Sequence, residues 1–178
     1  MITRALVCVL MAAARLLELQ HSRRNMQANA AADEGRWSRR TYPLMVALHT
    51  AVIGVTFLRG GRPRARWLLL LLAVQPLRAW ILLLLGNRWN TRGNVPRSLV
   101  VETRGPYSLV RHPNYLVVSV ELAALPLAFG LPGLATMATA ANAVLLMPRI
   151  REEERALMTF PEYRAHFATR RRFVPYLF

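Results

Sequence analysis

The sequence predicts an all-α protein, an integral membrane helical bundle of about five transmembrane helices with a cytoplasmic C-terminal helical cap. Of its 178 residues, 54% are hydrophobic, and they gather in blocks long enough to be buried in a bilayer. Every basic side chain except histidine is arginine, and the arginines cluster between the blocks, as the positive-inside rule expects. Residues 104–115 hold two prolines, two tyrosines and a histidine directly before an apolar segment, which indicates a shaped turn at a membrane surface.

Four apolar blocks define the predicted spans. Single helices are expected at about residues 2–19, 42–58 and 67–85. The fourth block, residues 115–147, is far longer than the roughly 20 residues that cross the hydrocarbon. Glycines and a proline at 129–133 form a turn signal in its middle, so we expect a helical hairpin there.

The spans divide the chain into two units. Residues 1–87 form an N-terminal unit of three spans on the substrate side, although the sequence leaves open whether the first block crosses the bilayer completely. Residues 88–178 form an interfacial loop, the hairpin and the C-terminal cap. Five spans place three arginine-rich regions on one side together with the turn at 104–115, so this side is expected to be cytoplasmic. The loop at 59–66 carries four arginines on the opposite side and weakens this bias.

Composition excludes several other classes of protein. The net charge of +15 would suit a nucleic-acid partner, but the arginines border apolar blocks, so we expect no nucleic acid. Cys8 is the single cysteine, which rules out an intrachain disulfide and a cysteine-based metal site. The histidines show no metal-ligand spacing, and we expect no metal. Without a glycine-rich turn between a strand and a helix, a Rossmann-type enzyme is also excluded.

The segment after the last span continues as a helix that leaves the membrane. Within residues 148–157, Arg149 and Glu153 are four apart and therefore share a face. Residues 159–162 fit a capping box with proline in the first turn, which predicts a short helix carrying Tyr163. This tail and the turn at 104–115 together form the predicted cap.

The cap combines residue types that suit one kind of chemistry. Carboxylates accept hydrogen bonds from ribose hydroxyls, and tyrosine rings pack on a base or on a sulfonium cation. An arginine at the membrane edge orients an anionic oxygen. The combination suits S-adenosylmethionine and a lipid-like acceptor. Methyl transfer from a sulfonium to an oxyanion cancels two charges, so a water-poor site favours it.

These motifs resemble the isoprenylcysteine carboxyl methyltransferase family. The resemblance covers about residues 88–178, through Gly-Pro-Tyr, Arg-His-Pro-Asn-Tyr, the apolar hairpin, Arg149 with Glu153-Glu154, and a closing Tyr163 and Pro175. Shorter motifs in the N-terminal half resemble a bacterial branch of the family, whose members O-methylate alkylpyrones or alkylresorcinols beside type III polyketide synthases. These motifs lie at residues 15–19, 22–25, 42–43, 49 and 88–92.

The resemblance implies a role for each matching residue. Arg149 faces the substrate and orients its reactive oxygen. One departure is His166, which stands where many members have tyrosine. The positions that match the S-adenosylmethionine pocket are Tyr107, His112, Pro113, Asn114, Tyr115, Glu153 and Glu154.

Two polar residues inside the apolar blocks, Glu121 and His49, each allow two interpretations. Glu121 lies in the fourth block, where an ionised carboxylate is costly and often functional. It is either a structural partner of Arg78 or a catalytic base for a phenol or enol hydroxyl. His49 in the second block is more often a hydrogen-bonded bundle residue than a ligand.

The sequence therefore predicts a membrane-bound, S-adenosylmethionine-dependent O-methyltransferase. The expected acceptor is a lipophilic small molecule among the membrane lipids, in the first instance a hydroxyl of a polyketide-type phenolic lipid or alkylpyrone. Carboxyl methylation of a prenylated cysteine is the alternative, and a non-catalytic scaffold or transport protein is an alternative of another class. The branch resemblance and the lysine-free composition favour the bacterial inner membrane. The oligomeric state is left open.

Overall fold

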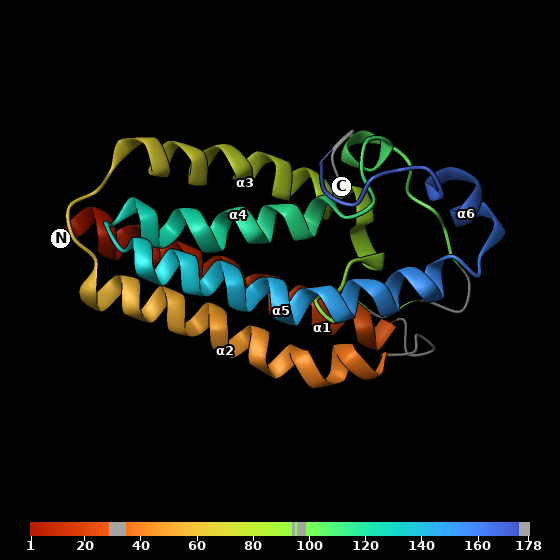
Figure 1. Cartoon of the computed structure of the whole chain (residues 1–178), viewed down its shortest axis with the longest axis horizontal. Coiled ribbons are helices and arrows are strands. Elements are labelled where there is room, and N and C mark those ends of the chain that lie inside the picture. Colours follow the sequence, from red (N-terminus) through yellow and green to blue (C-terminus); the bar gives the residue numbers. More distant parts are fainter. Residues whose placement is uncertain (29–34, 94, 96–98, 175–178) are drawn as a thin grey trace.

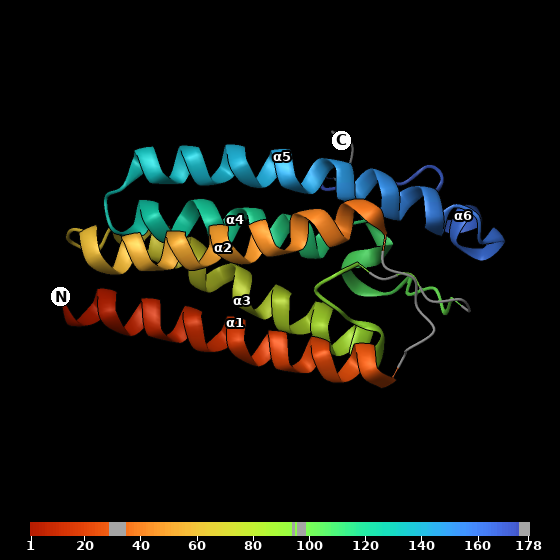
Figure 2. The same ribbon diagram turned by 90° about the horizontal axis from the view of Figure 1, so that it is seen from below.

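The computed structural model describes residues 1–28, 35–93, 95 and 99–174, and over these ranges the chain is helical without an extended strand. Five long helices lie side by side and alternate in direction (Figures 1 and 2). Two short 3-10 helices, η1 (Gly86–Arg88) and η2 (Gly105–Ser108), lie between the third and fourth long helices, and a short helix, α6 (Pro161–Phe167), follows the fifth. The long helices are α1 (Ile2–Ala28), α2 (Arg36–Arg59), α3 (Ala65–Leu85), α4 (Pro113–Ala128) and α5 (Pro132–Leu157).

The predicted helical hairpin is confirmed. Helix α4 ends at Ala128 and α5 begins at Pro132, which occupies its first turn. Gly130 between them has φ +78, a conformation that favours glycine because it lacks a Cβ. Small side chains let the two helices approach closely, since Ala124, Ala128, Ala135 and Ala138 are all buried.

The predicted all-helical class is confirmed, and the predicted membrane spans are confirmed in part. Two segments, Arg36–Arg59 and Ala65–Arg88, are long and apolar enough to cross a membrane, and Pro113–Ala128 is apolar but shorter. The count of five transmembrane helices remains a prediction. The first helix runs on to Ala28, well past the predicted end of the first block, because Ser22 and Asn25 in its last turns are buried against the loop after α3.

The distribution of polarity differs from that of a soluble bundle, because large apolar side chains cover much of the exterior. Leu10 of α1, Leu69 of α3 and Leu83 of α3 are each more than half exposed. Polar side chains are buried alongside the apolar core, among them Thr41, Thr56, Arg78, Glu121, Asn142 and Arg149. An apolar exterior with polar groups paired inside the bundle is stable where lipid surrounds the protein.

Four charged residues form a compact ionic group inside the bundle. Arg78 of α3 donates from Nε and Nη2 to the two carboxylate oxygens of Glu18 of α1, at 2.5 and 2.6 Å. Arg15 lies 3.1 Å from Glu18 and 3.4 Å from Glu121 of α4. The pairing of Glu121 with Arg78 considered from the sequence is present at 3.8 Å, but the close partner of Arg78 is Glu18. The charges balance, so no ion is left uncompensated in a medium of low dielectric constant.

The short helix α6 is confirmed, but the predicted capping box is wrong. The helix begins at Pro161 after Phe160, and no side chain caps it. The hydroxyl of Thr159 instead donates to the carbonyl of Ala156 at 2.7 Å. That carbonyl belongs to the last turn of α5, where acceptors lack helical partners.

The N-terminus of α2 is capped by a carboxylate from another helix. Glu152 of α5 accepts backbone hydrogen bonds from Trp37 at 2.9 Å and from Ser38 at 3.3 Å. Gly35 allows this approach, since a Cβ there would lie 2.2 Å from Oε2 of Glu152. The contact therefore links α2 to α5 at the arginine-rich end of the bundle.

Replacing Glu152 with alanine is expected to destabilise the protein by about 1 kcal/mol, the usual effect of losing a helix cap. Thermal unfolding in detergent measures this loss. Glu152→Gln keeps an acceptor oxygen and should lose less. Equal stability of the wild type and Glu152→Ala would contradict the capping role.

Candidate functional site

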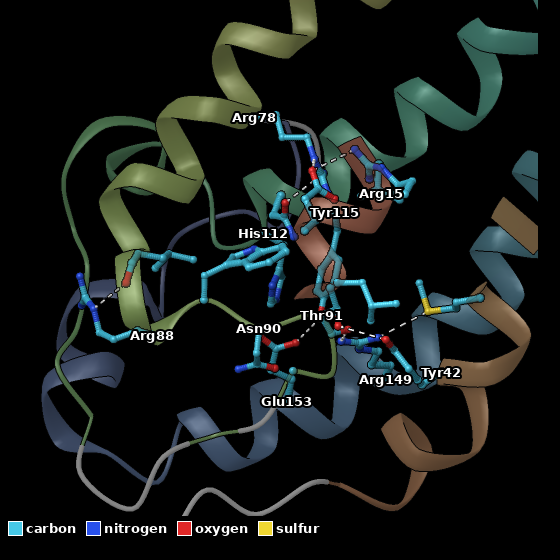
Figure 3. Close-up of a pocket in the computed structure, with 18 of the residues that line it drawn as sticks. Arg15, Tyr42, Arg78, Arg88, Asn90, Thr91, His112, Tyr115, Arg149 and Glu153 are labelled. Carbon is cyan, nitrogen blue, oxygen red and sulfur yellow. Dashed lines mark hydrogen bonds and ion pairs between the residues drawn. The ribbon is translucent and has the colours of Figure 1, made fainter. Parts of the chain in front are cut away.

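A cavity of about 600 Å³ opens at the end of the bundle where the arginine-rich segments meet. All five long helices contribute to its wall, and the loop between α3 and α4 covers it. Figure 3 shows Arg15 and Arg78 at one end of this region and Arg149 and Glu153 at the other, with Tyr115 between them. Its volume lies within the range that holds a drug-sized ligand.

The predicted turn at 104–115 forms one wall of the cavity. Gly105 has φ +55, and a Cβ on it would lie 2.7 Å from the ring of Trp80, so the backbone approaches α3 closely. The chain then pairs with the C-terminal segment, where backbone amides of Arg111 and His112 donate to carbonyls at 171 and 172, at 2.8 and 2.9 Å. Pro113 starts α4 directly afterwards. This geometry directs Asn114 and Tyr115 into the cavity wall.

Tyr115 and Glu153 are in close side-chain contact in this wall. The Tyr115 hydroxyl donates to Oε2 of Glu153 at 2.5 Å. Within the described part of the chain, the other carboxylate oxygen has no hydrogen-bond donor, and Glu153 lines the cavity. One oxygen of Glu153 is thus held in place while the second is available to a ligand.

Arg149 is buried at 3% exposure beside Glu153. Its Nη2 donates to the backbone carbonyl of Thr91 at 2.5 Å, and its Nη1 lies 3.5 Å from Sδ of Met45. Gly93, at φ +66, packs against both charged residues, since a Cβ there would lie 3.1 Å from Arg149 and 3.3 Å from Glu153. The predicted shared face of Arg149 and Glu153 is therefore a face of the cavity.

Asn114 connects this wall to the ionic group inside the bundle. Its side-chain oxygen accepts a hydrogen bond from Nη1 of Arg78 at 3.2 Å, while Arg78 is held by Glu18. The orientation of a predicted cofactor residue is thus fixed by an arginine of α3.

Two predicted cofactor residues lie outside the cavity lining, Pro113 and Glu154. Glu154 instead accepts hydrogen bonds from the side chains of Arg172 at 2.7 Å, His112 at 3.2 Å and Arg111 at 3.3 Å. Burial alone would raise the pKa of Glu154, but the hydrogen bonds from His112 and Arg172 outweigh it and lower the pKa to about 2. The carboxylate of Glu154 thus joins the turn at 104–115 to the C-terminal segment. Pro175, part of the resemblance, falls outside the described residues.

Glu121, the candidate base, also lies outside the lining of the large cavity. It borders a separate cavity of about 10 Å³ together with His49 and Arg15. Gln75 donates to its Oε1 at 2.9 Å. The structure thus surrounds Glu121 with structural partners and places it one layer behind the large cavity.

The loop directly after α3 contributes wall residues to the cavity. Residues 88–92 belong to the bacterial-branch resemblance, but none of them was predicted to be part of the site. Trp89 is 2% exposed and lines the cavity, and its indole N–H is buried without a hydrogen-bond partner among the described residues. Thr91 donates its amide to the Ser22 hydroxyl at 2.9 Å, which fixes the loop on α1. A sequence feature that marks the start of this loop is the abrupt change at residue 86 from leucines to polar residues.

Aromatic side chains complete the enclosure. Tyr107 and Tyr163 both line the cavity, and burial raises the pKa of each, with the charge of Glu153 adding to the effect. Their hydroxyls therefore remain protonated donors. Glu102, in the loop between α3 and α4, also lines the cavity. A hydrogen bond from Arg104, reinforced by Arg88, lowers the pKa of its carboxyl group to about 2.

Comparisons with known proteins agree with this geometry. Residues 67–159, just over half of the chain, match the isoprenylcysteine carboxyl methyltransferase (ICMT) family. The chain is also 31% identical over 153 residues to the uncharacterized protein YpbQ of Bacillus subtilis (strain 168), an alignment covering 82% of this chain and 91% of that protein. The family resemblance noted in the sequence is thereby confirmed.

The contact between Glu154 and the loop is expected to depend on pH. Because the folded pKa of about 2 lies below the usual 4.5, the stabilisation is complete above about pH 5 and is lost as the pH falls toward 2. Glu154→Gln should cost about 2 kcal/mol at neutral pH, and its difference from the wild type should shrink in acid.

Thermal unfolding in detergent at several pH values measures both effects. Glu162→Gln, a substitution at an exposed glutamate of α6, is the matched control and should change little. A difference between Glu154→Gln and the wild type that stays constant from neutral to acid pH would contradict the ionised contact.

Proposed function

The chain belongs to the isoprenylcysteine carboxyl methyltransferase family, and we propose that it transfers a methyl group from S-adenosylmethionine to an oxygen of a lipophilic acceptor. Family membership makes it a membrane-associated methyltransferase. The observation that carries the finer proposal is the wall shared by Arg149 and Glu153, where an anchoring cation and an open carboxylate face one cavity. A non-catalytic scaffold does not require this pair at the wall of a ligand-sized cavity.

The residues around the cavity fit the cofactor. Glu153 has an oxygen available to accept from ribose hydroxyls, and Trp89 has a buried indole N–H without a partner among the described residues. Tyr107, Tyr163 and Phe167 supply aromatic surface for the base and the sulfonium. When bound, the cofactor supplies a methyl group that leaves its sulfur without the bonding electrons.

The acceptor side of the cavity reaches the apolar exterior between α1 and α2. Leu16 of α1 lines the cavity and is 66% exposed, and Val46 of α2 lines it and is 42% exposed. A Cβ on Gly54 would meet nothing within 4 Å, so the wall is open there. We therefore assign this opening to an acceptor that enters from the bilayer, with the cap on the cytoplasmic side.

Arg149 lies between the cofactor side and the acceptor side of the cavity, where it orients the acceptor oxygen. Thr91 and Met45 hold two of its nitrogens, and Nε is buried without a hydrogen-bond partner within the described residues. A rigid guanidinium stabilises an acceptor oxygen that carries negative charge. Burial excludes water, which otherwise screens the attraction between them.

Two acceptor classes fit this site. The name of the family supports a prenylated cysteine, whose carboxylate is ionised at neutral pH. A phenol or enol needs a base to remove its proton, and this requirement separates the two classes chemically. The polyketide-type acceptor has no support from the comparisons beyond the shared family.

Glu153→Gln is expected to weaken binding of S-adenosylhomocysteine by about 10- to 150-fold, since hydrogen bonds to a charged group contribute about 1.5–3 kcal/mol. Calorimetry on the purified protein in detergent measures the affinity, with Glu162→Gln as a control that should bind like the wild type. Unchanged affinity in Glu153→Gln would place the cofactor elsewhere.

Arg149→Lys is expected to lower kcat by about 100- to 1,000-fold, because lysine keeps the charge but cannot hold the planar fork against Thr91. S-adenosylhomocysteine should still bind within about threefold. Methyl transfer to a prenylated cysteine and to an alkylphenol, assayed with labelled cofactor, gives kcat. The control is Arg151→Gln, an exposed arginine on the same helix, and an equal loss in both variants would refute a specific role for Arg149.

A further inference from the structure

His49 of α2 has one ring nitrogen fixed and the other unengaged. Its Nδ1 lies 2.8 Å from the carbonyl oxygen of Met45, one helical turn earlier. A carbonyl oxygen only accepts hydrogen bonds, so Nδ1 carries the proton, and the neutral ring keeps its lone pair on Nε2. No described residue donates to Nε2, and the side chain lines the large cavity.

The position of His49 along α2 places it close to the proposed reaction centre. Met45, which fixes its ring, also contacts Nη1 of Arg149 at 3.5 Å. One helical turn is a rise of about 5.4 Å, so His49 lies one turn deeper in the bundle than the arginine proposed to hold the acceptor. It also borders the small cavity beside Glu121.

The charged groups near His49 come from three neighbouring helices. Arg15 from α1, Arg78 from α3 and Glu121 from α4 are the charged groups that act on it. Both arginines are paired with carboxylates, by way of Glu18 and Glu121. The two arginines and two glutamates beside His49 are therefore neutral as a group.

We propose that His49 is the catalytic base and that the acceptor is a hydroxyl compound, a refinement that rests on the methyltransferase function proposed above. The acceptor oxygen bonds to the methyl carbon, and the sulfur keeps the electron pair of the broken S–C bond. The O–H bond breaks with its electrons staying on oxygen, and the proton moves to Nε2 of His49. The imidazolium then releases the proton to water, which restores the base.

The substrate class follows from the presence of this base. A carboxylate acceptor is already ionised and gives His49 no proton to remove. A phenol has a pKa near that of tyrosine, about 10, so its reaction at neutral pH gains from a general base that takes the hydroxyl proton. Glu121, behind its structural partners, lacks direct access to the large cavity, whereas His49 has it.

The test compares three acceptors in the wild type and in His49→Asn. Asparagine retains an N–H for the Met45 carbonyl but has no Nε2 base. The acceptors are para-dodecylphenol, the same phenol with fluorine at both positions beside the hydroxyl, and N-acetyl-S-farnesylcysteine. The pH is set so that the fluorinated phenol is ionised and the parent phenol is not. His166→Asn, at a histidine outside the cavity lining, is the matched control.

We expect His49→Asn to lose about 100-fold or more in kcat/KM on the parent phenol and less than about threefold on the two ionised acceptors. Equal losses on all three would overturn the proposal in favour of a structural role. A wild type that methylates the farnesylated cysteine alone would also overturn it, while leaving the methyltransferase function intact. A folded wild type that binds no S-adenosylhomocysteine and methylates nothing would refute the proposed function itself.

A second readout does not depend on turnover. In nitrogen NMR of histidine-labelled protein, the signal missing from His49→Asn identifies His49 among the four histidines. In the complex with S-adenosylhomocysteine, Nε2 should be unprotonated and should shift when para-dodecylphenol is added, but not when its methyl ether is added. A protonated Nε2, or identical responses to the phenol and the ether, would overturn the assignment.

Discussion

Two arginines and two glutamates inside the bundle join helices whose outer surfaces are largely apolar. Arg15 and Glu18 belong to α1, Arg78 to α3 and Glu121 to α4. Removing one partner would leave a buried charge uncompensated, which is far more costly than losing a surface pair. Each charge therefore fixes the positions of the others. The site depends on this group, because Arg78 also orients Asn114 at the cavity wall.

The cavity combines two environments that a single helix pair cannot supply. Its outer end, near α6, carries Glu153, tyrosines and the loop after α3, and it suits a polar, charged ligand. Its inner end, between α1 and α2, is lined by leucine and valine side chains that reach the exterior. Arg149 stands where these ends meet, held by one residue from the loop and one from α2. In the proposed function, the polar end receives the water-soluble donor and the apolar end receives the lipid.

The sequence was sufficient for features that depend on local pattern. Glycine and proline at 129–133 predicted the hairpin, and the four-residue spacing of Arg149 and Glu153 predicted their common face. Features that depend on tertiary contact were not accessible in this way. No spacing rule brings Glu154 to Arg111 and Arg172.

Two further features show the same limit at single residues. The capping-box pattern at 159–162 failed because an unsatisfied carbonyl of α5 competed for the threonine hydroxyl. Gly93 carried no signal of its own, since the close approach that requires it involves residues more than 50 positions later in the chain.

The turn at 104–115 pairs with residues 171 and 172, and this pairing determines the order in which the parts of the site form during synthesis. The loop at 110–112 leaves the ribosome well before the segment with which it pairs. Until that segment arrives, the loop amides lack their acceptors and Glu154 lacks Arg172. All five long helices are therefore made before this wall of the cavity can close. The apolar end of the cavity between α1 and α2 is thus synthesised earlier than the wall that carries Glu153 and the C-terminal segment that completes it.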